Sequence, residues 1–271
     1  MGLCMSYVAE LVSDVSYKIG HATKRVVLRA GRRFAQANEI RPGFFDQYPQ
    51  FFETSETTAF ANRLNERHRA IIDANRDAIS GKRVLDIASH DGRWSFAALK
   101  AGAAHITGLE AREHLIKAAT ENLRDFGSDR FQFIQGDAYK ALAQLEPGSI
   151  DTIMCLGFFY HVTEHMTLLS LIERLKPQHI IIDTGVAADA RSVVVWQVEN
   201  HEFESDAFKT ANVQKAVLAG VPSKPALDMM LTSLGWKPRY YDWKNVGIRN
   251  WAHIDDYQED YRVTLRVDAN R

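Results

Sequence analysis

The sequence Arg83-Val-Leu-Asp-Ile-Ala-Ser-His-Asp-Gly-Arg-Trp94, followed by Ala104-His-Ile-Thr-Gly-Leu-Glu110, carries the strongest structural signal in the chain. It predicts a short apolar strand ending near Asp86, a tight loop, a helix, and a second strand ending in Glu110. This is half of a mononucleotide-binding fold, with an acidic residue at the tip of each strand. A carboxylate about 20 residues beyond the first strand is placed to accept hydrogen bonds from both hydroxyl groups of an adenosine ribose.

The loop after the first strand is poor in glycine. A dinucleotide needs several glycines so that the backbone can approach its pyrophosphate, whereas this loop has Ala88, His90 and Gly92 at the corresponding positions. Asp91 adds a negative charge beside Asp86, which would repel a pyrophosphate but suits a ligand with an ammonium and a sulfonium group. The loop therefore favours S-adenosylmethionine over NAD as the ligand.

Residues 81 to about 185 resemble the core of the class I S-adenosylmethionine-dependent methyltransferases. In that family the loop reads Asp/Glu-x-Gly-x-Gly-x-Gly, of which this chain keeps the acid and the last glycine. Phe131-Gln-Phe-Ile-Gln-Gly-Asp137 resembles the third strand with its acidic residue, and Ser149-Ile-Asp-Thr-Ile-Met-Cys-Leu-Gly157 resembles the fourth, whose tip faces the methyl group. The resemblance implies S-adenosylmethionine as cofactor, in contact with Asp86, Ala88, Ser89, His90, Gly92, Trp94, Glu110, Ala111, Asp137, Ala138, Leu156, Gly157 and Tyr160.

Strands and helices alternate at short spacing through the middle of the chain, which predicts an α/β fold with a doubly wound, mostly parallel sheet. Together with the resemblance, this implies a Rossmann-like domain over residues 81–271, with seven strands and a C-terminal antiparallel hairpin. We expect an insertion at about 188–222 that shapes the substrate site. Strands are expected near 83–88, 105–110, 131–135, 150–156, 179–183, 237–243 and 261–267, and helices near 92–102, 111–125, 138–145, 165–175 and 223–235.

Residues 1–80 are expected to form a helical N-terminal extension. Within 8–33, apolar residues at helical spacing precede a basic stretch, which suits weak contact with a membrane surface, a docking helix, or a solvated helix lying on the domain. Phenylalanine pairs and a basic helix follow before residue 80, and the family commonly uses such a segment as a lid. Arg63, Arg67 or His68 could then meet the methionine carboxylate, or the charges of this helix could simply face water.

The chemistry is expected directly after the fourth strand. Gly157-x-x-Tyr160-His161 resembles the corresponding segment of wobble-uridine carboxymethyltransferases and related small-molecule methyltransferases, in which the tyrosine approaches the cofactor. A hydroxyl nucleophile must lose its proton, and His161 is the first candidate for that general base, with His165 as the second and Tyr160 as a positioning residue. His161-x-x-Glu164-His165 also has the ligand spacing of inverted zinc metalloproteases, but it lies inside a cofactor-binding fold and no separate helix obviously supplies a third ligand, which argues against proteolysis. A metal bound here in a methyltransferase, with Asp183 as an extra oxygen ligand, stays an alternative, and we assign no metal.

Composition limits the partners. The formal net charge of −1 gives no global attraction to nucleic acid or to an anionic membrane. Two cysteines cannot build a disulfide framework, no apolar run reaches the roughly 20 residues needed to span a bilayer, and no secretory signal is evident, so we expect a cytoplasmic protein.

The favoured function is O-methylation of a small molecule. The alternatives are methyl or carboxymethyl transfer to a nitrogen or an RNA base, and a non-catalytic protein that binds S-adenosylmethionine; the missing glycines disfavour a nicotinamide-dependent oxidoreductase.

Overall fold

The computed structural model describes residues 41–54, 60–200, 202–203 and 216–269. The chain divides into two units, residues 1–41 and 42–271, and the second contains almost all of the described residues. The predicted basic segment at 8–33 lies outside the described residues. Among the described residues, no helix has the length and apolar character needed to cross a membrane.

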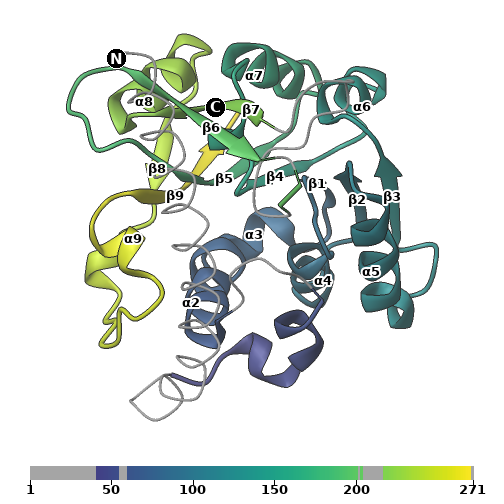
Figure 1. Cartoon of the computed structure of the whole chain (residues 1–271). Helices are drawn as coiled ribbons and strands as arrows, with labels where there is room; N and C mark the ends of the chain where they lie inside the picture. The colour runs from purple at the N-terminus through teal and green to yellow at the C-terminus, as the bar shows by residue number, and fades with distance from the viewer. Residues whose placement is uncertain (1–40, 55–59, 201, 204–215, 270–271) are drawn as a thin grey trace, which may run out of the picture. The chain divides into compact units, whose positions relative to one another are not determined.

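A seven-stranded sheet forms the centre of the second unit, in the strand order β3-β2-β1-β4-β5-β9-β8 (Figure 1). The first five strands in the chain are parallel, and β9 and β8 pair antiparallel at one edge. The predicted doubly wound, mostly parallel sheet with its C-terminal hairpin is therefore confirmed. The strands are β1 (Arg83–Ile87), β2 (His105–Glu110), β3 (Phe131–Gln135), β4 (Thr152–Leu156), β5 (His179–Gly185), β8 (Pro238–Tyr240) and β9 (Arg262–Asp268).

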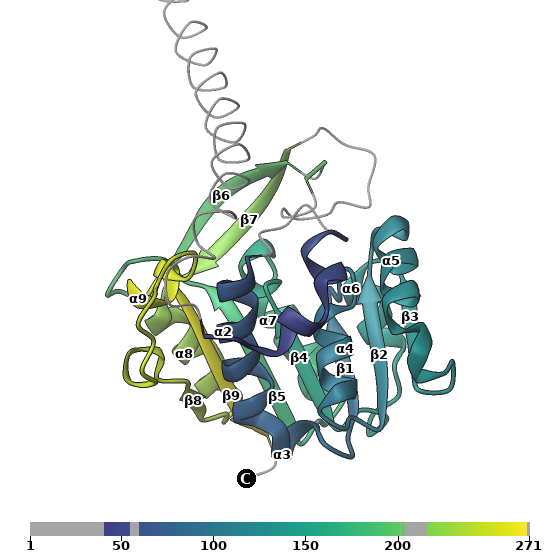
Figure 2. The ribbon, with the colours of Figure 1, turned by 90° about the horizontal axis from the view of Figure 1, so that it is seen from below.

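Helices cover both faces of this sheet, and each face has its own apolar cluster. Figures 1 and 2 show α2 and α4 on one side and α7 and α8 on the other. Side chains alternate between the faces as strand geometry requires, since Leu85 and Ile87 belong to one cluster and Val84 to the other. The helices are α2 (Ala61–Ile71), α3 (Arg76–Ile79), α4 (Arg93–Lys100), α5 (Glu113–Leu123), α6 (Ala138–Gln144), α7 (His165–Arg174), α8 (Lys224–Ser233) and α9 (Asp255–Gln258).

The segment before β1 packs onto the sheet. Short 3₁₀ helices at Phe44–Gln47 and Pro49–Phe52 precede α2, and the rings of Phe45 and Phe51 are completely buried in the cluster on the α2 side. Phe45 packs edge-on against Trp94 at the start of α4, with 5.5 Å between the ring centroids. These contacts place α2 beside the loop that follows β1. The function of residues 42–80 as a lid stays a prediction.

A two-stranded antiparallel sheet interrupts the order between β5 and α8. It consists of β6 (Val194–Asn200) and β7 (Ala216–Pro222), within the segment where the sequence predicts an insertion. The hairpin stands beyond the end of the seven-stranded sheet (Figure 2). It is attached to the loop after β4, because the backbone N–H of Gly220 donates to the carbonyl of Val162 at 3.2 Å. The insertion thereby reaches the edge of the sheet where the carboxyl ends of the parallel strands lie.

Candidate functional site

A cavity of about 400 Å³ lies at the carboxyl ends of the parallel strands. This is the edge at which open α/β sheets bind their ligands. Residues from α2, the strand ends, β7 and β9 line it. The lining includes, among the residues predicted from the sequence, Ala88, His90, Trp94, Glu110, Ala111, Asp137, Ala138, Leu156, Gly157, Tyr160 and His161. It does not include Asp86, Ser89, Gly92 or His165.

The loop after β1 adopts a glycine-like backbone although two of its expected glycines are missing. Ala88 and His90 have φ values of +56° and +54°, and Gly92, at the N-terminus of α4, has +76°. Residues other than glycine adopt this left-handed region at a cost of about 1–2 kcal/mol, and such strain gathers at functional sites. Ala88 and His90 therefore adopt the backbone conformation that glycine favours at these positions.

Glu110 fixes this loop at the end of β2. One of its carboxylate oxygens accepts the backbone N–H of His90 at 3.0 Å, and the other accepts that of Arg112 at 2.9 Å. Each carboxylate oxygen retains capacity for a second hydrogen bond. Glu110 lines the cavity and is almost completely buried, so its carboxylate can receive a pair of ligand hydroxyl groups in a site with little water.

Asp86 lies below the loop and does not reach the cavity. Its carboxyl group is buried and accepts a hydrogen bond from the hydroxyl of Ser95 at 2.7 Å. Burial raises the pKa of Asp86 to about 7, and the charge of Glu110 adds to this increase against the effect of the Ser95 hydrogen bond. The position of Asp86 favours the neutral acid rather than a carboxylate in direct contact with ligand.

The predicted role of Asp91 as a source of negative charge for the ligand is wrong. Its side chain is completely buried and forms a two-pronged ion pair with Arg93, at 2.7 and 2.8 Å. The hydroxyl of Thr54 also donates to it. Arg93, rather than Asp91, lines the cavity, so this end of the site presents a guanidinium group whose charge is compensated.

Asp137 marks the opposite end of the cavity, after β3. Its side chain caps α6 by accepting the backbone N–H of Lys140 at 3.0 Å. Gly136, Ala138 and Tyr139 line the cavity with it. The cap holds one carboxylate oxygen of Asp137 and leaves the other available to a donor from a ligand.

Of the two histidines predicted as general base, His161 lines the cavity, and the carboxylate of Glu199 holds its ring. His161 lies in a 3₁₀ turn after β4 (Phe159–His161), and its Nδ1 is 2.7 Å from the carboxylate of Glu199 in β6. Gln197 in turn donates to Glu199 at 2.9 Å. An ionised carboxylate only accepts, so in the neutral ring Nδ1 carries the proton and Nε2 the lone pair, whereas the imidazolium carries a proton on each nitrogen.

His165 has a different place. It is buried at the start of α7, and its Nε2 lies 2.9 Å from the backbone carbonyl of Gly220 in β7. Burial lowers the pKa of His165, against the raising effect of its hydrogen bonds to the backbone. This contact joins α7 to the hairpin, and it gives His165 a structural position outside the cavity lining.

Tyr160 meets the positive end of the cavity. Burial raises the pKa of its hydroxyl, but the charges of His161, Arg262 and Arg67 outweigh that effect and lower it to about 8. The guanidinium carbon of Arg262 lies 5.4 Å from the centre of the Tyr160 ring. Of the three residues proposed to meet a carboxylate, Arg63 and Arg67 line the cavity, whereas His68 stacks on Phe44 outside it.

Several residues of the site have no signal in the sequence. Glu199, Val217 and Leu218 come from the hairpin, and Arg262 comes from the start of β9. No motif surrounds them, and only the paired strands bring them to the residues after β4. Within the described part of the chain, no group of three or more histidine, cysteine or acidic side chains is placed to hold a metal ion.

The donor set fits S-adenosylmethionine. Glu110 presents a carboxylate for ribose hydroxyls, and Ala88 and His90 of the loop line the same cavity. Asp137 and Ala138 lie at the end where a base would extend, and Leu156 and Gly157 line the far end, after β4.

Comparisons with known proteins identify a methyltransferase domain and the same fold. The family model described as "Methyltransferase domain" matches residues 79–243. The structure of the N-terminal domain of EvdMO1 with SAH bound superposes with a TM-score of 0.56 at 17% sequence identity, covering 89% of this chain and 97% of that one.

Two curated relatives share the sequence at low identity. The ubiquinone biosynthesis O-methyltransferase of Idiomarina loihiensis is 30% identical over 117 residues, which is 43% of this chain and 47% of that protein. A Methanocaldococcus jannaschii relative, named for methylation of the large-subunit ribosomal RNA, is 26% identical over 171 residues, or 62% of this chain and 42% of that protein. The chain thus spans about half the length of the curated relatives it matches.

Proposed function

The chain belongs to the class I S-adenosylmethionine-dependent methyltransferase family, and from this premise we propose that it methylates a hydroxyl group of a small-molecule acceptor. The observation that carries the proposal is the contact of 2.7 Å between Nδ1 of His161 and Glu199 at the wall of the cavity. It supplies a base for the proton that a hydroxyl nucleophile must lose. The name of the Idiomarina loihiensis relative also supports transfer to oxygen.

The residues that would hold the cofactor lie along one side of the cavity. S-adenosylmethionine supplies a methyl group already activated by a sulfonium centre. Glu110 would accept the ribose hydroxyls, Asp137 and Ala138 would border the adenine, and the backbone around Ala88 and His90 would contact the methionine portion. The contribution of the protein to such a displacement is mainly alignment of the reacting atoms, because the leaving group needs no further activation.

His161 would take the proton from the acceptor. Glu199 holds Nδ1–H, which orients the ring and leaves the lone pair on Nε2 as the site of protonation. Glu199 also stabilises the imidazolium that forms when the proton arrives. Imidazole groups generally titrate near neutral pH, where general-base catalysis is most effective.

The test is His161→Gln, measured for turnover on a panel of catechols and for affinity toward S-adenosylhomocysteine. We expect turnover to fall about 10²- to 10⁴-fold with little change in affinity, because the base acts only in the chemical step. His165→Gln is the matched control. It should lower the thermal midpoint, since His165 joins α7 to Gly220, but it should leave turnover per folded molecule within about threefold. Equal turnover of the His161 variant and the wild type would assign the proton transfer elsewhere.

A second candidate is transfer to a nitrogen or to an RNA base. The Methanocaldococcus jannaschii relative named for ribosomal RNA methylation favours it, and so does the resemblance of Gly157-x-x-Tyr160-His161 to the wobble-uridine enzymes. The formal net charge of −1 gives the chain no general attraction for RNA, which places this candidate behind the small-molecule acceptor. A non-catalytic protein that only binds the cofactor would show S-adenosylhomocysteine affinity without turnover on any acceptor.

A further inference from the structure

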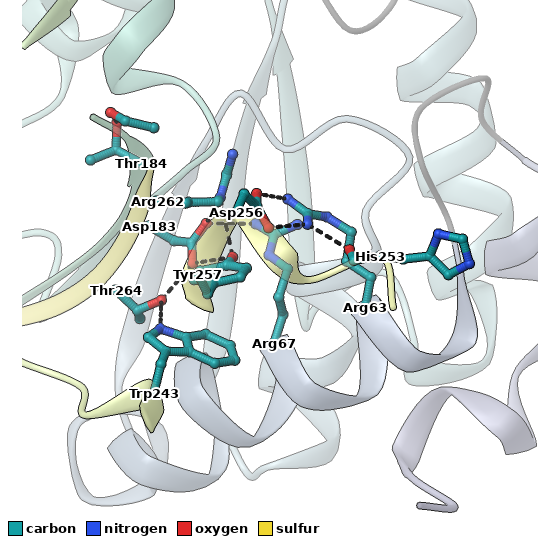
Figure 3. Close-up of polar contacts among 11 residues, drawn as sticks. Arg63, Arg67, Asp183, Thr184, Trp243, His253, Asp256, Tyr257, Arg262 and Thr264 are labelled. Carbon is teal, nitrogen blue, oxygen red and sulfur yellow. Dashed lines mark hydrogen bonds and ion pairs between the residues drawn. The ribbon is translucent and has the colours of Figure 1, made fainter. Parts of the chain in front are cut away.

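A buried charge cluster lies at the end of the cavity opposite Asp137, where α2, β5, α9 and β9 meet (Figure 3). Its centre is Asp183, which is completely buried. One oxygen of Asp183 accepts from Arg67 at 2.9 Å and from Arg262 at 2.7 Å. The other accepts from the hydroxyls of Tyr257 at 2.8 Å and Thr264 at 2.6 Å. A carboxylate offers about four lone-pair sites, so Asp183 has no capacity left for a further donor.

The charges in this cluster do not balance. Arg67 and Arg262 share the single carboxylate of Asp183, whereas the neighbouring Arg63 has Asp256 to itself in a two-pronged pair at 2.7 Å. One positive charge at the cavity wall is therefore uncompensated by these ion pairs. Charge in a buried position is costly unless a partner of opposite sign is present.

The hydrogen bonds of Arg67 likewise lack an acceptor. Nε of Arg67 is buried and has no hydrogen-bond partner in the described part of the chain, although Nη2 of the same side chain bonds to Asp183. The whole Arg67 residue is 9% exposed, so water has little access to this donor. An unsatisfied buried donor costs about 1–3 kcal/mol, so the groups around Arg67 satisfy its guanidinium only in part.

The guanidinium carbon of Arg67 lies 5.0 Å from the centre of the Trp94 ring at the start of α4, and it is the position of Arg262 that points to the acceptor rather than to the cofactor. Arg262 lies over the ring of Tyr160, and a methyl group added at Gly157 would come 3.4 Å from its Nη2. This is the end of β4, beyond the loop and the Glu110 carboxylate that would hold the cofactor.

We propose that Arg67 and Arg262 together bind a carboxylate group of the acceptor, so that the substrate is an anionic hydroxy compound. This inference rests on the proposed function and adds a substrate class to it. Two guanidinium groups that share one buried aspartate form a receptor for one further carboxylate, with fork-shaped donor geometry that favours a planar, two-oxygen anion.

The test compares charged and neutral probes on the full-length chain saturated with S-adenosylhomocysteine. The probes are acetate, benzoate and 3,4-dihydroxybenzoate, each against its uncharged amide, and calorimetry measures their affinities. We expect at least one carboxylate to bind about 10- to 100-fold more tightly than its amide, as charge-assisted hydrogen bonds of about 1.5–3 kcal/mol imply. Equal binding of every pair, or binding of no carboxylate, would overturn the proposal.

Variants of the arginines test which side chains cause the preference for a carboxylate over its amide. Arg67→Gln removes the surplus charge while Arg262 still pairs with Asp183, and Arg262→Lys keeps the charge but loses the fork, so each should reduce the preference at least fivefold. Arg69→Gln, on the same helix but outside the cavity lining, is the matched control and should keep the preference. If Arg67→Gln weakens S-adenosylhomocysteine affinity and spares the carboxylate preference, the anion is the cofactor's own and the proposal is wrong. Failure of the wild type to bind S-adenosylhomocysteine would instead contradict the proposed function itself.

Discussion

Glu110 offers the sharpest perturbation of the cofactor site, because its carboxylate has two tasks. It would accept the ribose hydroxyls, and it already accepts the backbone N–H groups of His90 and Arg112. Glu110→Gln keeps one oxygen and replaces the other by a donor, so it removes the charge and half of the acceptor capacity. Glu110→Ala removes both tasks.

The expected magnitudes follow from these contacts. Hydrogen bonds to a charged group contribute about 1.5–3 kcal/mol, so Glu110→Gln should weaken S-adenosylhomocysteine affinity roughly 10- to 100-fold. Glu110→Ala should also leave two backbone donors without an acceptor, at about 1–3 kcal/mol each. It should therefore lower the thermal midpoint by several degrees in addition to the loss of affinity.

Calorimetric titration with S-adenosylhomocysteine and thermal melts of the apo protein measure the two effects separately. Glu113→Gln is the control, since it makes the same change of charge on an exposed side chain of α5 that pairs with Lys117. It should change neither quantity measurably. Unchanged affinity in Glu110→Gln would remove this carboxylate from the cofactor site and refute the proposal that the end of β2 binds the ribose.

Three further outcomes are expected. Glu199→Gln should lower turnover about tenfold or more and shift its pH profile, with S-adenosylhomocysteine affinity retained, since it acts through the orientation and charge of His161; an unchanged pH profile would deny it that role. The pKa of Asp86 is raised from 3.8 to about 7, so the native state binds this proton more tightly than the unfolded chain and stability falls as pH rises between these values. Asp86→Asn should therefore raise the thermal midpoint at pH 8 but hardly at pH 4, and an equal effect at both would show that the carboxyl group ionises normally. Ala88→Gly should be neutral or stabilise by up to about 1 kcal/mol in chemical denaturation, because φ at this position is +56°. Ala97→Gly within α4 should destabilise instead, and the same loss at both positions would argue against a strained loop.

The sheet was predictable from the sequence because local patterns determine its elements. Apolar runs end at Asp86 and Glu110 with a helix between them, and the right-handed connection of parallel strands leaves little freedom in how such units pair. Ser223 caps α8 through the backbone N–H of Ala226, as its position before the proline predicts. The antiparallel edge formed by β8 and β9 likewise lies where the sequence alternation places it.

The polar side of the site was only partly predictable, because tertiary contacts create it. Nothing near Glu199 in the sequence indicates that β6 presents it to His161, 38 positions earlier. The same holds for Arg262, which meets Asp183 only because β9 pairs with β5. Asp91 shows the opposite failure, since its charge is visible in the sequence but its partner Arg93 cancels it in the fold.

Transfer of a labelled methyl group tests the central claim most directly. The purified chain would be incubated with S-adenosylmethionine carrying a radioactive methyl group, together with a panel of catechols and total RNA, and the products separated into small-molecule and RNA fractions. The account predicts label in an alkali-stable methyl ether in the small-molecule fraction, and loss of that label in His161→Gln. Label in the RNA, or label on a nitrogen of a small molecule, would contradict the proposed acceptor. S-adenosylhomocysteine binding without any transfer would contradict catalysis on these acceptors altogether.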